Sequence, residues 1–130
     1  MFKALVLQQN NKQTSAQIQQ LDEAELPIGN VEVDVEYSSL NYKDGLAITA
    51  KARVVQSFPM IPGIDLAGTV SSSEDQRFKK GDKVVATGYG LGEKHWGGMA
   101  EKAKLDADFL VPLAAGLDTK KAMQIGTAGL

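Results

Sequence analysis

The stretch of sequence that decides the fold is Pro62-Gly63-Ile64-Asp65-Leu66-Ala67-Gly68-Thr69-Val70. Pro62-Gly63 predicts a turn, because proline fixes φ and glycine accepts φ values that other residues avoid. Residues 64–72 then predict a strand, because short apolar residues continue until a serine-rich turn. Gly68 interrupts this strand, and a glycine at such a position indicates a bulge or the close approach of another backbone.

The segment upstream of this stretch has the most regular pattern in the chain. From Val31 to Tyr37, valine or tyrosine alternates with glutamate or aspartate. A period of two residues predicts a half-buried strand with one apolar face. Further strands are expected at residues 1–8, 15–21, 83–87, 99–105 and 109–111. Many short, evenly spaced strands predict a mainly β fold: a partly open antiparallel β-barrel with a few short helices.

Composition excludes several classes of protein. The 130 residues include one histidine and no cysteine, which excludes a disulfide scaffold, a cysteine nucleophile and a thiolate metal site. The net charge is −2 and no block of lysine or arginine occurs, which argues against nucleic acid as a partner. No apolar run approaches the roughly 20 residues of a membrane span, and none is typical of a signal peptide. We therefore expect a cytoplasmic protein.

The C-terminal segment predicts a helix that begins after Asp118, whose side chain can cap it. No capping residue or polar tail precedes Leu130, and Met123 lacks an evident apolar surface to cover it. We expect residues 1–117 to form one domain and residues 118–130 to begin a helix that continues in a longer protein. The alternative is a helix that frays at a natural terminus.

Four motifs in order give the chain a family resemblance. The stretch 62–70 resembles a motif of the medium-chain dehydrogenase/reductase superfamily, whose N-terminal half is a GroES-like barrel. Residues 38–44, 78–84 and 97–101 resemble the neighbouring pieces of the same pattern. Residues 40–70 are most similar to the zinc-free branch that contains quinone oxidoreductases and acryloyl-CoA reductases. The resemblance covers the whole chain but only the first part of such an enzyme.

Departures from the family are equally informative. Zinc-dependent members place a cysteine where Asn41 stands and a His-Glu pair where Ile64 and Asp65 stand. Because catalytic zinc needs three protein ligands, we expect no metal site. The chain also lacks a strand–G-x-G-x-x-G–helix unit, and the glycines at 88–98 predict a mobile loop rather than a phosphate cradle. We therefore expect the isolated chain to bind NADPH weakly or not at all.

The resemblance implies the function of a longer parent enzyme. That function is NADPH-dependent, zinc-independent reduction of an activated C=C bond, as in acryloyl-CoA, or of a quinone. Its partner is the small-molecule substrate, and the parent is expected to be a homodimer that contacts neither nucleic acid nor a membrane. The isolated 130-residue chain is expected to be inactive. The alternative is a stand-alone GroES-like binding or assembly module without enzymatic activity.

The resemblance also suggests residues that meet the cofactor. Tyr42 is the catalytic candidate, because its phenol can donate a hydrogen bond to the nicotinamide moiety or to a substrate carbonyl. The alternative is a tyrosine packed against Leu40 and Leu46. Asn41 either binds the cofactor or caps the following helix. Thr127 is expected near the cofactor in the parent enzyme.

Three further residues are candidates for substrate binding. Lys43 is expected to meet a phosphate or an anionic thioester intermediate, or else to be solvated. Asp65 either points into the cleft or fixes the Pro62-Gly63 turn by local hydrogen bonds. Trp96 either shapes an acyl pocket or anchors the glycine-rich loop on the barrel. Asp44, in contrast, is expected to be structural and to bond a nearby backbone N–H group or cation.

Overall fold

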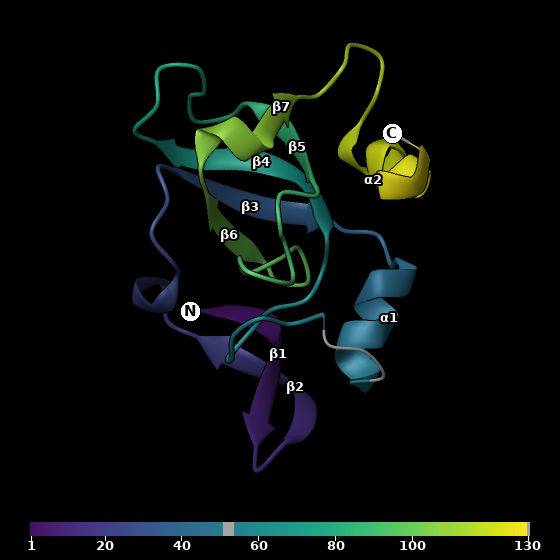
Figure 1. The fold of residues 1–130 in the computed structure, drawn as a ribbon. Coiled ribbons are helices and arrows are strands. Elements are labelled where there is room, and N and C mark those ends of the chain that lie inside the picture. The colour runs from purple at the N-terminus through teal and green to yellow at the C-terminus, as the bar shows by residue number, and fades with distance from the viewer. Residues whose placement is uncertain (51–53, 130) are drawn as a thin grey trace.

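The computed structural model describes residues 1–50 and 54–129, and side chains as far as residue 126 (Figure 1). The strands are β1 (Phe2–Asn10), β2 (Gln13–Leu21), β3 (Val31–Tyr37), β4 (Asp65–Ser73), β5 (Lys83–Thr87), β6 (Lys102–Leu105) and β7 (Leu110–Pro112). The helices are α1 (Tyr42–Thr49), α2 (Thr119–Gly129) and two 3₁₀ turns, η1 (Glu23–Glu25) and η2 (Ala107–Phe109). None of the described helices is both long and apolar enough to cross a membrane.

The strands form two open antiparallel sheets. β1 pairs with β2, and the second sheet has the order β6-β3-β4-β5-β7. Figure 1 shows the β1–β2 hairpin below the five-stranded sheet. Helices α1 and α2 both lie at the right of the view. The prediction of a mainly β, antiparallel fold with few helices is confirmed. The described strands do not close into a barrel, since β6 and β7 remain the two edges of the larger sheet.

The core of the larger sheet follows the alternation in β3. Val31 and Val33 are wholly buried and pack with Leu66 and Val84 of the neighbouring strands. Tyr37, which continues the same alternation, is 44% exposed. One of the two register shifts in the pairing of β3 with β4 lies between Val35 and Tyr37, where the burial of the apolar face ends. The predicted apolar face therefore holds for the first half of the strand.

Gly68 lies at a close approach of β3 and β4. It pairs with Val35, and a Cβ atom at this position would overlap the backbone carbonyl oxygen of Asp34. The predicted close backbone approach is confirmed, and only glycine fits there without moving a strand.

Helix α2 begins as predicted but does not continue regularly to the end of the chain. The carboxylate of Asp118 accepts a 2.7 Å hydrogen bond from the N–H of Lys121, which confirms the expected cap. Met123 is 5% exposed and packs with Ala67 of β4, so the sheet covers the residue that lacked evident cover in the sequence. Gly126 has φ 68° and ψ −176°, which interrupts the helix. The sequence did not predict this kink, and the expectation that residues 118–130 lead into a longer protein stays a prediction.

Candidate functional site

The site is built around the connection between β3 and α1. Asn41 is the N-cap residue of α1, as expected, with extended backbone angles of φ −119° and ψ 162°. Its N–H donates a 2.9 Å hydrogen bond to the carboxylate of Asp44, the third residue of the helix. An acceptor at that position satisfies an N–H group that the first helical turn leaves unpaired. This contact fixes the direction in which the chain enters α1.

Asp44 joins the start of α1 to the turn at residues 62–63. The side chain is buried, and its Oδ1 accepts hydrogen bonds of 3.1 Å from the N–H groups of Gly63 and Ile64. The structural role expected for Asp44 is confirmed. The carboxylate of Asp44 thus holds this turn, a role for which the sequence had offered Asp65 as a candidate. Burial raises the pKa of Asp44 and the neighbouring charge of Asp65 adds to it, while the N–H donors lower it.

Asp65 organises the segment that precedes Asn41. Its carboxylate, wholly buried at the start of β4, accepts hydrogen bonds from the N–H of Ser39 at 2.8 Å and from the Ser39 hydroxyl. The side-chain amide of Asn41 donates to it at 3.2 Å, and the hydroxyl of Ser38 donates to its backbone carbonyl at 2.8 Å. Asp65 therefore holds residues 38–41 in place. Its predicted contact with a substrate stays a prediction.

Tyr42 is the most accessible side chain at the start of α1. It is 83% exposed and its neighbour Leu40 is 75% exposed. A tyrosine packed against Leu40 and Leu46, which was the alternative to a functional role, would be mostly covered. The phenol is instead open to solvent. Its contact with a cofactor or substrate stays a prediction.

Of the other two predicted substrate-binding residues, Lys43 contacts the glycine-rich loop, 88–98, and Trp96 belongs to this loop. The Nζ of Lys43 lies 2.5 Å from a carboxylate oxygen of Glu93, although its side chain remains 52% exposed. The indole N–H of Trp96 donates a 3.0 Å hydrogen bond to the carbonyl of Pro59. Trp96 also packs against two apolar clusters, which supports the alternative that it anchors the loop. Lys43 is thus an ion-pair partner as well as an accessible cation.

The kink in α2 brings the end of the chain to the same region. A Cβ atom on Gly126 would lie 3.0 Å from the Oγ of Ser39 and 4.0 Å from a carboxylate oxygen of Asp65. The predicted cofactor residue Thr127 follows directly, but its side chain lies outside the described part of the structure. Its contact with the cofactor stays a prediction.

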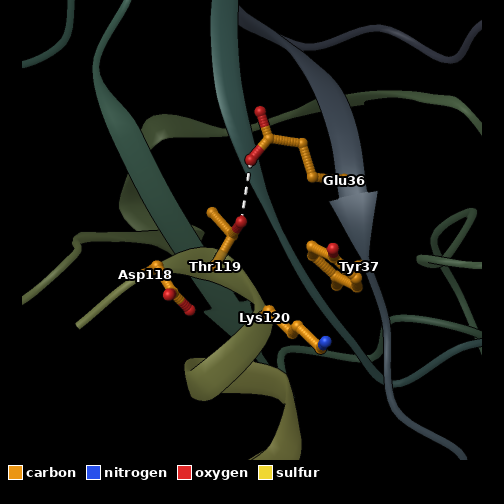
Figure 2. A pocket seen from close by; sticks show the side chains of 5 residues that line it. All are labelled: Glu36, Tyr37, Asp118, Thr119 and Lys120. Carbon is orange, nitrogen blue, oxygen red and sulfur yellow. Dashed lines mark hydrogen bonds between the residues drawn. The ribbon is translucent and has the colours of Figure 1, made fainter.

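A pocket of about 570 Å³ opens between the end of β3 and the start of α2 (Figure 2). The residues that line it are Glu36, Tyr37, Asp118, Thr119 and Lys120. The carboxylate of Glu36 accepts a 2.8 Å hydrogen bond from the hydroxyl of Thr119, drawn in Figure 2. Sequence reasoning placed Glu36 on a polar strand face and missed this contact, because nothing in the alternation of β3 indicates where α2 docks.

Glu36 has two further partners besides Thr119. Its carboxylate accepts a 2.7 Å hydrogen bond from the hydroxyl of Thr69 and lies 2.9 Å from the Nζ of Lys83. Burial by itself would raise the pKa of Glu36, but the hydrogen bonds from Thr69, Lys83 and Thr119 outweigh it and lower the pKa. Among the described residues, no group of three or more His, Cys, Asp or Glu side chains could hold a metal ion.

Comparison with known proteins identifies relatives over almost the whole chain. The chain is 58% identical to the probable acrylyl-CoA reductase AcuI of Escherichia coli, with 98% of the chain and 40% of the relative covered. It is 46% identical to the putative quinone oxidoreductase YhfP of Bacillus subtilis, with 99% of the chain and 39% of the relative covered. The chain thus spans about 40% of the length of these curated relatives.

The fold agrees with that of a solved relative. The crystal structure of the YhdH oxidoreductase from Salmonella enterica, in complex with NADP, superposes with a TM-score of 0.96 at 57% identity. The alignment covers 98% of this chain and 39% of that protein. The family model described as the alcohol dehydrogenase GroES-like domain matches residues 27–115, and this agrees with the resemblance inferred from the motifs. The chain belongs to the alcohol dehydrogenase GroES-like domain family.

Proposed function

We propose that residues 1–117 are the substrate-side, N-terminal domain of a zinc-independent, NADPH-dependent oxidoreductase that reduces an activated C=C bond, as in acryloyl-CoA. Residues 118–130 begin the connection to a cofactor domain, and the complete enzyme is a homodimer. The observation that carries this proposal is the 58% identity to a probable acrylyl-CoA reductase over 98% of the chain. The solved relative that was crystallised with NADP supports the choice of cofactor.

We assign Asn41 and Tyr42 to the nicotinamide end of NADPH, because the phenol of Tyr42 is accessible and the amide of Asn41 is held by Asp65. All strand pairs in the described residues are antiparallel, so the parallel unit that typically holds a pyrophosphate is not among them. We therefore propose that residues outside this chain bind the phosphates and that the isolated chain is inactive.

The chemistry follows from where charge develops during the reduction. When bound, NADPH would supply a hydride to the β-carbon of the substrate, and a proton from a side chain or from water would complete the reduction at the α-carbon. Negative charge then grows on the substrate carbonyl oxygen, where a preorganised donor is most effective. The exposed phenol of Tyr42 is the donor that we assign to this oxygen. Neither Asn41 nor Ile64 is a usual zinc ligand, which supports a reduction without zinc.

A quinone is the second candidate substrate. The 46% identity to a putative quinone oxidoreductase of Bacillus subtilis favours it, and this identity is lower than the identity to the acrylyl-CoA reductase. Reduction of a quinone also places negative charge on a carbonyl oxygen, so the same phenol would serve.

The test is an assay of the complete protein with acryloyl-CoA and with a quinone in parallel, each with NADPH and with a metal chelator. We expect NADPH oxidation that depends on acryloyl-CoA and resists the chelator. Turnover with the quinone alone would favour the second candidate, and turnover with neither would refute the reductase assignment. The 130-residue chain, assayed alone, is expected to show no turnover.

A further inference from the structure

We propose that Ser39 and Asp65 are positioning residues that fix the side-chain amide of Asn41 for contact with the cofactor. This inference rests on the proposed function, because it concerns how the cofactor-facing end of α1 is held. Neither residue is assigned a contact with a ligand. Each acts through Asn41.

Three hydrogen bonds hold the amide nitrogen of Asn41. The Nδ2 atom donates to the Oγ of Ser39 at 3.1 Å, to the carboxylate of Asp65 at 3.2 Å and to the carbonyl of Ser39 at 3.4 Å. These acceptors all lie on the side of the protein interior, since Asp65 is wholly buried. The nitrogen therefore faces inward.

The carboxylate also determines which end of the amide faces inward. An ionised carboxylate only accepts hydrogen bonds, so the hydroxyl of Ser39 directs its hydrogen to Asp65 and presents a lone pair to Asn41. An amide turned by half a rotation would set its oxygen against the Asp65 carboxylate. Because the Asp65 carboxylate is wholly buried, such an oxygen–oxygen contact would be costly. Ser39 and Asp65 together thus select one orientation of the Asn41 side chain.

Gly126 of α2 borders the hydrogen-bonded cluster that Ser39, Asn41 and Asp65 form. Its hypothetical Cβ would lie 3.0 Å from the Oγ of Ser39, which leaves no room for a larger residue unless Ser39 moves. The hydroxyl is therefore confined between Asp65 and the kink of α2. The position of Asn41 is thus coupled to the chain segment that reaches Thr127.

The experiment is a double-mutant cycle in the complete enzyme, with steady-state kinetics against NADPH. Ser39→Ala removes the hydroxyl and keeps the backbone N–H that Asp65 also accepts. We expect it to raise the KM for NADPH about fivefold, as the loss of one hydrogen bond implies, with a smaller change in kcat. Asn41→Ala should raise the KM by a similar factor. The double variant should be no worse than Asn41→Ala alone, because Ser39 acts through Asn41.

A matched control is Ser72→Ala, which removes a hydroxyl from an exposed position of β4 and should leave the KM unchanged. If Ser39→Ala does not yield folded enzyme, Ser39→Cys fills the same space with a weaker hydrogen-bonding group and serves in the same cycle.

Two results would overturn the inference while leaving the cofactor role of Asn41 intact. One is an unchanged KM in Ser39→Ala when Asn41→Ala raises it. The other is a double variant whose KM increases by the product of the two single effects, because independent action excludes positioning. An unchanged KM in Asn41→Ala would instead refute the cofactor contact in the proposed function, and the inference with it.

Discussion

The carboxylate of Glu36, near the end of β3, accepts a 2.8 Å hydrogen bond from the hydroxyl of Thr119, the first residue of α2 (Figure 2). The two residues are 83 positions apart in the chain. The same carboxylate contacts Thr69 of β4 and Lys83 of β5. A single side chain therefore joins three neighbouring strands to the helix that leads toward Asn41.

Replacing Thr119 by valine tests this junction. Thr119 is 7% exposed, so valine keeps the shape of the side chain and removes only the hydroxyl. Glu36 retains its other partners, and we expect the free energy of unfolding to fall by about 1 kcal/mol, as for one hydrogen bond. Denaturant unfolding of the 130-residue chain measures it. Thr14→Val in β2 is the control and should change stability by less than about 0.5 kcal/mol. Equal effects of the two variants would show that the Glu36 contact contributes nothing.

The lowered pKa of Glu36 predicts how this stabilisation depends on pH. A carboxyl group whose pKa is lower in the folded state stabilises the fold at pH values above its unfolded pKa, here near 4.5. The contribution is lost as pH falls through the folded pKa. We expect the stability difference between the wild type and Glu36→Gln to be constant above about pH 5.5 and to shrink at lower pH. Unfolding midpoints measured across this range test it, and a difference independent of pH down to the folded pKa would contradict it.

Elements fixed by neighbouring residues could be predicted from the sequence. The period of two residues gave β3 its bounds of Val31–Tyr37, and the cap at Asp118 gave the start of α2. The N-cap at Asn41 was equally local. In each case the residues that carry the pattern lie within a few positions of the element that they predict. Periodicity and capping report such short-range preferences directly.

The contacts of the site could not be predicted in the same way. Asp44 bonds a turn 19 residues away, and the Asp65 carboxylate bonds Ser39, 26 residues away. The sequence offered Asp65 as a candidate for holding the turn and did not name Asp44 for it, because no local pattern distinguishes the two aspartates. Gly126 is a similar case, because an isolated glycine in a helical pattern does not by itself predict a kink. Tertiary contact with Ser39 accompanies the kink, and only the folded structure shows it.

Gly126 and Gly116 form a matched pair for the next prediction. Both have positive φ, 68° and 86°, so alanine strains either position by about 1–3 kcal/mol. A Cβ on Gly116 meets nothing within 4 Å, whereas on Gly126 it meets Ser39. We expect both variants to lower the unfolding midpoint, but only Gly126→Ala to raise the KM for NADPH in the complete enzyme. Equal KM values in the two variants would show that the kink and the Ser39 cluster are not coupled.

Replacement by alanine is expected to have opposite effects on stability at Gly68 and at Gly45. A Cβ on Gly68 would overlap the carbonyl oxygen of Asp34, so alanine must push β3 and β4 apart. We expect a loss of about 3 kcal/mol or more. Gly45 lies inside α1 with no atom within 4 Å of its Cβ position, and alanine there should stabilise by about 0.5–1 kcal/mol. Thermal unfolding of the two variants decides both signs, and a Gly68→Ala protein as stable as the wild type would contradict the close approach.

The last prediction concerns the phenol of Tyr42. Tyr42→Phe removes only the hydroxyl from a side chain that is 83% exposed, so the fold should keep its stability within about 0.5 kcal/mol. If the phenol donates to the oxygen that gains charge, its removal should lower kcat about tenfold or raise the KM for NADPH by a similar factor. Tyr89→Phe is the control, because Tyr89 is also exposed and its stacking on Phe109 needs only the ring. Tyr42→Phe enzyme with kcat and KM both within about twofold of the wild type, a change under 0.5 kcal/mol, would remove Tyr42 from the catalytic site.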